Sequence, residues 1–377
     1  MNDIFQITLI LVASLGATLI SRRIGIPAVV GQILVGILLS PSVFNLIHQG
    51  HTIEVLAEIG VILLMFLAGL ESDLSLLKKY FRPSLLIAVT GVLIPLFTFG
   101  LILKFMGYDL STSIFYGIVF AATSVSITIE VLQEYGKLKS KAGNIILGAA
   151  IVDDIIAVIL LSVFTSTKTS SGNLTIQFLL EAVFLGFLVL LHFTLPRLWK
   201  FVERMPIFAK NTTVALVLCL ILSLLANSVG LSAVIGSFFA GLAISQTDPA
   251  HKIEEYISVV AYTFFVPIFF VSIAISVTFQ GLFSSPWLVL FLTVLAVLTK
   301  FIPAYLSGRI AHLEYSDSLL IGTGMIARGE MALIVAQIGL SSSIIDNQLY
   351  SELVIIIVLT TIISPFLIKW SLHKNKS

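Results

Sequence analysis

The chain has 377 residues, of which 58% are hydrophobic and only 11% are charged, and its formal net charge at pH 7 is +1. Soluble domains carry about 25% charged residues, so this composition, with a mean hydropathy of +1.10, excludes an ordinary soluble protein and indicates lipid as the solvent. The small net charge argues against a nucleic-acid partner, and a single cysteine, Cys219, excludes a disulfide framework.

Apolar runs that can cross a hydrocarbon core of about 30 Å predict thirteen transmembrane helices. In chain order they fall at 4–20, 26–40, 54–70, 84–106, 112–134, 142–165, 174–199, 210–229, 231–246, 253–276, 287–311, 317–340 and 350–370. The second and ninth are short, so we expect them to tilt or to lie where the bilayer is thinned. The first run follows Asp3 rather than basic residues, which favours a retained span over a signal peptide.

Basic residues divide unevenly between the two sides that this count defines. Loops after odd-numbered spans, together with the C-terminal tail, hold seventeen: Arg22, Arg23, Lys78, Lys79, Arg82, Lys137, Lys139, Lys141, Arg197, Lys200, Arg204, Lys210, Lys252, Arg309, Lys369, Lys374 and Lys376. The opposite side holds only Lys104 and Lys168. By the positive-inside rule the N-terminus is outside and the C-terminus is cytoplasmic, and we expect a multi-pass protein of the cell (plasma) membrane.

Two segments of the chain resemble one another. Gly25–Ser40 and Gly230–Ser245 share six identical residues at an offset of 205: Gly25/Gly230, Ala28/Ala233, Val29/Val234, Gly31/Gly236, Gly36/Gly241 and Ser40/Ser245. The same offset maps the fourth span onto the eleventh, and the sixth onto the thirteenth. Segments seven spans apart have opposite orientations, so the pattern predicts an all-α fold of two inverted six-helix repeats joined by a linker helix.

Two spans have the composition of interrupted helices. In the fifth, Ala121–Thr128 concentrates four hydroxyl residues, and in the twelfth, Gly322–Glu330 combines three glycines with two charges. The 205-residue offset brings Thr123-Ser124 onto Arg328-Gly329. Unwound backbone at membrane depth is tolerated where protein or a water-filled cavity covers it. We therefore predict discontinuous helices that cross at the midplane, with carbonyls and half-helix ends free to act as ligands or counter-charges.

Adjacent aspartates, Asp153 and Asp154, lie in a stretch with no other charge from Ala142 to Phe164. A carboxylate at the centre of a membrane helix costs roughly 2.5–3.5 kcal/mol on insertion scales, so packing alone does not explain two of them. The ionisable residues expected at mid-membrane depth are Asp153, Asp154, Lys300, Arg328 and Glu330. Neighbouring helical residues point about 100° apart, so the two aspartates are expected to have different roles.

These residue types suit competition between a proton and a cation. One aspartate lines a cation site while the other meets Lys300. The Na⁺ ligands are expected from Asp154 and Asp153, with hydroxyl or carbonyl oxygens near Thr123 and Ser124. Arg328 and Glu330 compensate either one another or the half-helix ends.

No phosphate-binding loop, no Cys/His metal spacing and no nucleophile elbow is present in the sequence. We therefore expect a transporter rather than an enzyme, with no cofactor beyond the transported ion.

The segments GAAIVDDIIAVI, LTKFIPA, TSVSIT and GMIARGEMALI resemble monovalent cation:proton antiporter family 2, in particular the bacterial NapA-type Na⁺/H⁺ antiporters. The resemblance covers essentially the whole chain, and the double aspartate is its most specific part. It implies electrogenic exchange with Asp154 as the carrier of cation and proton. It also implies that Asp153 pairs with Lys300 until the cation arrives.

The same resemblance implies a homodimer that works as an elevator. Residues 1–83 and 206–280 would form the dimerisation domain, residues 84–170 and 281–377 the mobile ion-transport core, and residues 171–205 the linker helix. Kef-type relatives carry a cytoplasmic nucleotide-binding domain, whereas only a short tail follows the last span here. We therefore expect no such regulatory domain on this chain.

Other functions remain open at this point. One is K⁺/H⁺ antiport within the same family, because a carboxylate and a few oxygens fit Na⁺, Li⁺ and K⁺ alike. Another is Na⁺-coupled symport of an organic anion on a similar crossed-helix fold, for which Arg328 is the candidate anion site. A passive cation channel fits less well, since nothing resembles a repeated filter. The sequence also leaves open the stoichiometry and whether His48 or His51 senses pH.

Overall fold

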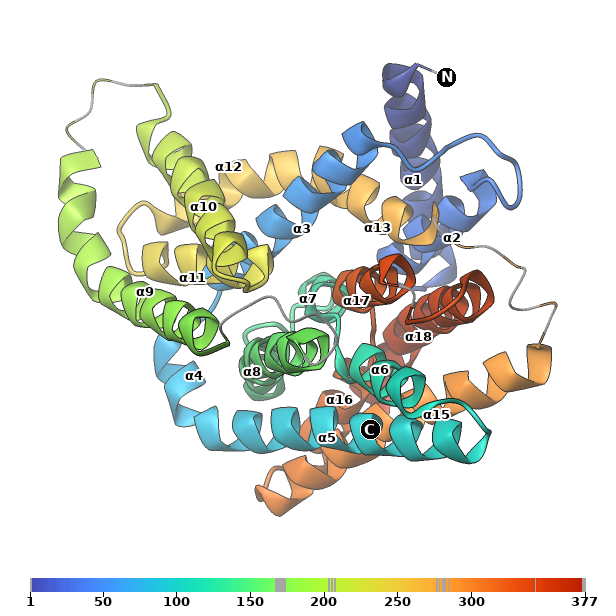
Figure 1. Ribbon diagram of the computed structural model, residues 1–377. Helices are drawn as coiled ribbons and strands as arrows, with labels where there is room; N and C mark the ends of the chain where they lie inside the picture. Colours follow the sequence, from blue (N-terminus) through green and yellow to red (C-terminus); the bar gives the residue numbers. More distant parts are fainter. Residues whose placement is uncertain are drawn as a thin grey trace.

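The computed structural model describes residues 2–166, 174–202, 204, 206, 208–275, 277, 279, 283, 285–342 and 344–374. Across these residues the regular structure is entirely helical (Figure 1). The first half contains α1 (Asp3–Ile24), α2 (Ala28–Leu39), α3 (His51–Leu70), α4 (Leu74–Lys79), α5 (Phe81–Phe105), α6 (Leu110–Ala121), α7 (Val125–Glu134), α8 (Lys141–Ser166) and α9 (Leu174–Val202). The second contains α10 (Lys210–Ser228), α11 (Ala233–Ile244), α12 (Ala250–Val260), the π-helix η1 (Ala261–Phe265), α13 (Val266–Ile275), α15 (Pro286–Ile310), α16 (Tyr315–Gly324), α17 (Glu330–Ser341) and α18 (Asn347–Lys374).

The predicted spans match these helices in order. Within the described residues, ten helical segments, some made of consecutive helices, are long and apolar enough to cross a membrane. The remaining predicted spans correspond to α2, to α11 and to the pair α16–α17, whose apolar helices are shorter. The all-helical membrane architecture is therefore confirmed, while the count of thirteen spans stays a prediction.

The helices pack in two groups (Figure 1). We call α1–α3 with α10–α13 the scaffold bundle, and α5–α8 with α15–α18 the charged bundle. In the charged bundle, α5 and α15 run side by side along one margin, and α6, α7, α8, α17 and α18 lie between them and the scaffold bundle. The helix α9 packs on α11 of the scaffold bundle, where the His192 ring contacts the Gln246 amide.

Small residues explain how the scaffold bundle closes. A methyl group at Gly69 would collide with the carbonyl oxygen of Phe238 on α11, and one at Gly241 would collide with that of Phe66 on α3. Without side chains at these two points, the backbones of α3 and α11 come into direct contact, as small residues permit in membrane helices. The repeated segment that contains Gly241 is thus a packing surface.

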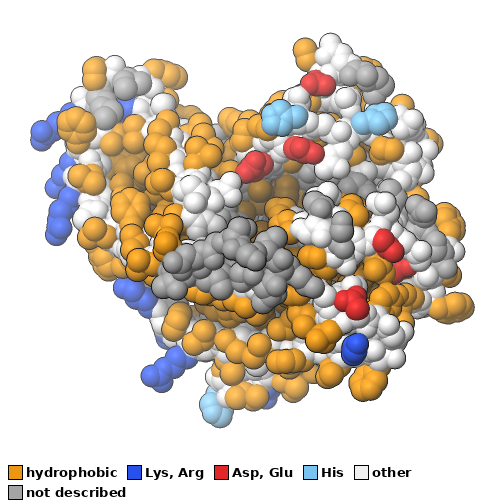
Figure 2. Space-filling view, in the orientation of Figure 1, with side chains coloured by type: hydrophobic (Ala, Val, Ile, Leu, Met, Phe, Trp, Pro, Cys, Tyr) orange, Lys and Arg blue, Asp and Glu red, His pale blue; other side chains and the backbone are white. Residues whose placement is uncertain are grey.

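Charge is distributed along the axis of the bundles. Lys and Arg side chains gather along one margin of the molecule, whereas most Asp and Glu side chains visible in the same view lie in the opposite half (Figure 2). Lys78 and Lys79 mark this basic end at the last turn of α4, and Lys141 marks it at the first residue of α8. The α3 helix runs from the opposite end at His51 to the basic end at Leu70.

Candidate functional site

The double aspartate of α8 meets the lysine of α15 inside the charged bundle. Lys300 Nζ lies 2.9 Å from Asp153 Oδ2, and both side chains are fully buried. The Thr123 hydroxyl donates to the same Oδ2 oxygen. The other oxygen, Asp153 Oδ1, is buried and has no hydrogen-bond partner in the described part of the chain. A carboxylate oxygen left open in a dry interior is costly and is a ready ligand for a small cation or a proton.

Asp154 has a different environment, as the 100° rotation between helical neighbours requires. It retains 8% of its exposure, whereas Asp153 has none. The contact between Asp153 and Lys300 that the resemblance implies is present. The assignment of the two aspartates to separate roles in transport remains a prediction.

Both predicted interruptions are present. The α6 helix ends at Ala121 and α7 begins at Val125, while α16 ends at Gly324 and α17 begins only at Glu330. The two unwound segments touch: Ser124 N donates to Ala327 O at 2.8 Å. The Ser124 and Ser126 hydroxyls are 3.0 Å apart, so oxygen atoms from side chains and backbone concentrate next to Asp153.

Each half-helix that ends in the membrane has one terminal carbonyl that accepts a hydrogen bond from the other interrupted helix. Arg328 is fully buried; its Nε and Nη2 donate to Phe120 O at 3.2 and 3.0 Å, and its Nη1 donates to Ile326 O at 3.2 Å. Reciprocally, the Thr128 hydroxyl donates to Gly324 O at 2.6 Å. A cation at a helix C-terminus offsets the negative end of the helix dipole, so Arg328 compensates the end of α6. The Glu330 side chain lies outside the described residues.

A cavity of about 980 Å³ leads toward this site between the two bundles. Its mouth lies at the end opposite the basic end, where Glu54 and Glu58 of α3 line it. Its deeper lining includes Val61 of α3 and Leu161 of α8. Leu161 follows Asp154 by seven residues, or about 10 Å along the helix, so the cavity approaches the aspartates from the non-basic end.

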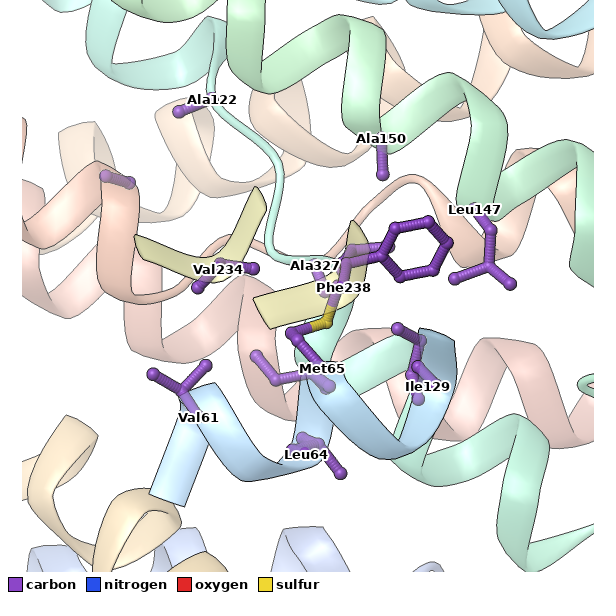
Figure 3. Packing of buried hydrophobic residues seen from close by; sticks show 14 of the residues in the cluster. Val61, Leu64, Met65, Ala122, Ile129, Leu147, Ala150, Val234, Phe238 and Ala327 are labelled. Atoms are coloured by element: carbon purple, nitrogen blue, oxygen red, sulfur yellow. The ribbon is translucent and has the colours of Figure 1, made fainter. Parts of the chain in front are cut away.

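At the basic end the passage is closed by apolar side chains. The Phe238 ring of α11 lies beside Ala150 and Leu147 of α8, with Met65 of α3 below it (Figure 3). All four belong to one buried hydrophobic cluster. Because Leu147 and Ala150 precede Asp153 on α8, this layer separates the aspartates from the basic end.

Polar contacts reinforce the closure further toward the basic end. Gln133 of α7 donates to Glu71 Oε1 at 2.9 Å and accepts from the Tyr262 hydroxyl of η1 at 2.5 Å. Glu134 Oε2 accepts from the backbone N–H of Ala28, at the start of α2, at 3.0 Å. Burial raises the pKa of Glu71, which caps α3 outside the membrane-spanning helix, and the Gln133 amide only partly offsets this effect. These contacts join α7 of the charged bundle to the scaffold bundle.

The expected set of mid-membrane ionisable residues was incomplete. Glu130 of α7 carries a buried Oε2 oxygen without a partner in the described part of the chain. Glu352 of α18 is 1% exposed. Both lie inside predicted spans, at 112–134 and 350–370, so the available signal was a lone carboxylate within an apolar run. The expectation overlooked them because both stand near span ends, where solvation is the default.

Comparisons with known proteins agree along the whole chain. The family model described as "Sodium/hydrogen exchanger, transmembrane" matches residues 10–374. The chain is 44% identical over 379 residues to a Na⁺/H⁺ antiporter of Enterococcus hirae, covering 99% of both. It is 38% identical to the Na⁺/H⁺-K⁺ antiporter GerN of Bacillus cereus, covering 97% of this chain and 95% of the relative. The solved structure of the sodium proton antiporter MjNhaP1 from Methanocaldococcus jannaschii at pH 8 has the same fold, with a TM-score of 0.73 at 17% identity, covering 97% of this chain and 96% of that one.

Proposed function

The chain belongs to the sodium/hydrogen exchanger family, whose members are transporters rather than enzymes, and from this premise we propose that it exchanges cytoplasmic Na⁺ or Li⁺ for external H⁺. One observation carries the proposal: a fully buried Asp153 offers one oxygen to Lys300 and Thr123 and keeps the other open, beside a second carboxylate. Such a site binds either a proton or a small cation, and binding of the cation displaces the proton and the reverse.

In the exchange cycle that we propose, Asp154 binds the cation or the proton. An arriving cation draws Asp153 and the Thr123 oxygen into its coordination shell and breaks the ion pair with Lys300. Lys300, left buried without its counter-charge, releases its proton to the cytoplasm, from which the cation arrived. A net charge then crosses the membrane in each cycle, so exchange is electrogenic. Ser124 supplies further oxygen ligands, and Arg328 holds the end of α6 in place.

We infer an elevator for alternating access. The cavity extends toward the site from one end, and an apolar layer blocks the other end, as expected for a carrier that is open to one side. Inverted repeats are supported by the helix bounds: α2 (Ala28–Leu39) and α11 (Ala233–Ile244), like α5 (Phe81–Phe105) and α15 (Pro286–Ile310), are separated by the same 205 residues. The charged bundle would slide against the scaffold bundle, and two scaffold bundles would form a homodimer.

We assign the basic end to the cytoplasm, because basic residues are retained on that side of the membrane. The N-terminus is then outside the cell, the C-terminus is cytoplasmic, and the cavity opens outward.

A K⁺/H⁺ exchange activity is the second candidate, supported by the name of the Bacillus cereus relative. Symport of an organic anion has no comparable support. The cavity is lined by Glu54 and Glu58 and by no lysine or arginine among the described residues. The Arg328 guanidinium is already occupied by carbonyl oxygens.

Transport in everted vesicles tests the proposal. Adding NaCl, LiCl or KCl to vesicles that hold an acid interior should dissipate the proton gradient, and Asp154→Asn should abolish the response. Asp317→Asn is the matched control, since Asp317 is an acidic residue of the charged bundle in a partly exposed ion pair. A response to NaCl that persists in the purified Asp154→Asn protein overturns the site assignment. The cation that elicits the largest response distinguishes Na⁺/H⁺ from K⁺/H⁺ exchange.

A further inference from the structure

We propose that Glu130 is a third transport carboxylate, which binds the cation or the proton on its way between the aspartates and the cytoplasm. The inference rests on the proposed function and adds a binding station to it. It assigns Glu130 to the cytoplasmic half of the pathway only.

Glu130 lies where such a station is required. The α7 helix begins at Val125, beside the unwound segment that contacts Asp153, and ends at Glu134 at the cytoplasmic end. Glu130 is five residues into this helix, or about 8 Å along its axis. It therefore lies between the aspartate site and the cytoplasm, on an element that reaches both.

The carboxylate of Glu130 differs from those of Glu134 and Glu71 in having a buried oxygen without a hydrogen-bond partner in the described residues. Glu134 accepts the Ala28 N–H, and Glu71 accepts the Gln133 amide. Glu130 Oε2 is buried without a hydrogen-bond partner in the described residues. Glu134, four residues on along the same helix face, adds a like charge. A buried carboxylate among like charges is costly unless it binds a proton or a cation.

The polar contacts at the cytoplasmic end lie close to Glu130 in this state. Tyr262 lies within electrostatic reach of both Glu130 and Glu71, and its hydroxyl joins Gln133 and through it Glu71. Tyr262 belongs to a π-helix, a feature frequent at functional sites. Because Gln133 lies on the charged bundle while Glu71 and Tyr262 lie on the scaffold bundle, movement of one bundle against the other would break this chain. Glu130 would then face the cytoplasm.

Glu130 and the polar contacts of Gln133 together suggest an order of events during transport. When the charged bundle moves inward, the chain through Gln133 opens and a cytoplasmic Na⁺ reaches Glu130 first, displacing its proton to the cytoplasm. The cation then passes to Asp154, and Glu130 regains a proton from the aspartate site. The charge on Glu130 returns to its starting value in each cycle, so the station alters cytoplasmic affinity but not stoichiometry.

The proposal is tested by measuring, from each face of the membrane, how a substitution of Glu130 changes the KM for Na⁺. In everted vesicles, which present the cytoplasmic face to the medium, Glu130→Gln should raise the KM for Na⁺ by roughly tenfold, the loss of one contact to a charged group. In right-side-out vesicles running in reverse, the KM for external Na⁺ should stay within twofold of the parent. Glu255→Gln is the control, because Glu255 is an exposed acidic residue of α12 at the same end.

A merely structural Glu130 would lower activity equally from both faces, and that result, or an unchanged KM from both, overturns the proposal. If Glu130→Gln does not fold, Glu130→Asp decides in the same two assays, since it keeps the carboxylate and shortens it by one methylene. A KM for Na⁺ that is raised only from the cytoplasmic face supports the station, and an equal change from both faces overturns it. Failure of the proposed function is recognised separately, because Asp154→Asn would then retain exchange.

Discussion

The scaffold bundle and the charged bundle are both made of apolar helices, yet the contacts described above hold their centres together in different ways. In the scaffold bundle, α3 and α11 meet backbone against backbone at Gly69 and Gly241. The centre of the charged bundle is held by an ion pair and by hydrogen bonds to unwound backbone. Contacts of the first kind cannot exchange partners, whereas each contact of the second kind can be replaced by an ion or a water. The difference suits a fixed support and a moving carrier.

The largest effect should follow from leaving a buried charge without its partner. Lys300→Met strands Asp153 in a fully buried site, at a cost of about 3–5 kcal/mol in the free energy of unfolding. The double variant Asp153→Asn/Lys300→Met should recover most of this loss in thermal denaturation in detergent. If the double variant is as unstable as Lys300→Met, the ion pair is not the contact that matters.

The same substitution separates stability from transport. In proteoliposomes of Lys300→Met we expect residual Na⁺/H⁺ exchange that no longer responds to an imposed membrane potential, because the proton on Lys300 supplies the net charge. An unchanged dependence on potential would contradict the role of Lys300 as a proton carrier.

The stability of the scaffold bundle should depend on side-chain volume at its helix contacts, whereas that of the charged bundle should depend on charge. Gly241→Ala forces a methyl group against Phe66 O, with Leu70 N only 2.8 Å away, so overpacking should cost about 1–3 kcal/mol. Gly186→Ala is the matched control, since nothing lies within 4 Å of a methyl group there. Equal melting temperatures for the two variants in size-exclusion and thermal-shift measurements would show that α3 and α11 do not need this contact.

The sequence predicted most of the charged bundle and less of the scaffold bundle. Interruptions at Ala121–Thr128 and Gly322–Glu330 could be recognised because hydroxyls, glycines and charges are rare within apolar runs. The repeat contains Gly241, but its contact with another helix is known only from the structure. The repeat could not identify α3 as the partner, because close contact across elements is a property of the fold rather than of either segment.

At the site itself, residue types could be predicted and individual atoms could not. Asp153, Lys300 and Thr123 were expected to meet, but the crowding of both donors onto Oδ2 depends on side-chain rotamers. Of the two partners expected for Arg328, the end of α6 is observed, because its carbonyls have no partner within their own helix. The sequence could not identify Glu130, because burial of a side chain near a span end depends on the neighbouring bundle.

The reciprocal capping of the half-helices gives a more moderate prediction for the charged bundle. Thr128→Val keeps the shape of the side chain and removes the donor to Gly324 O, so we expect a loss of about 1 kcal/mol in the free energy of unfolding. Thr8→Val is the control, since the Thr8 hydroxyl bonds within its own helix at an exposed position. A variant as stable as the parent would indicate that the end of α16 has another donor.

The smallest effect should come from the partly exposed charged pair at the basic end, which tests whether burial or charge determines how much an ion pair contributes to stability. Lys141 Nζ lies 3.4 Å from Asp317 Oδ2, with the two side chains 35% and 23% exposed. Exposed pairs contribute about 0–1 kcal/mol and are screened by salt, so Lys141→Ala should change the melting temperature slightly, and less in 1 M NaCl than at low salt. A loss of stability as large as that of Lys300→Met would mean that the pair contributes by linking α8 to α16, and that burial does not determine the contribution of ion pairs in this bundle. The distinction between an exchangeable buried pair and a static surface pair would then disappear.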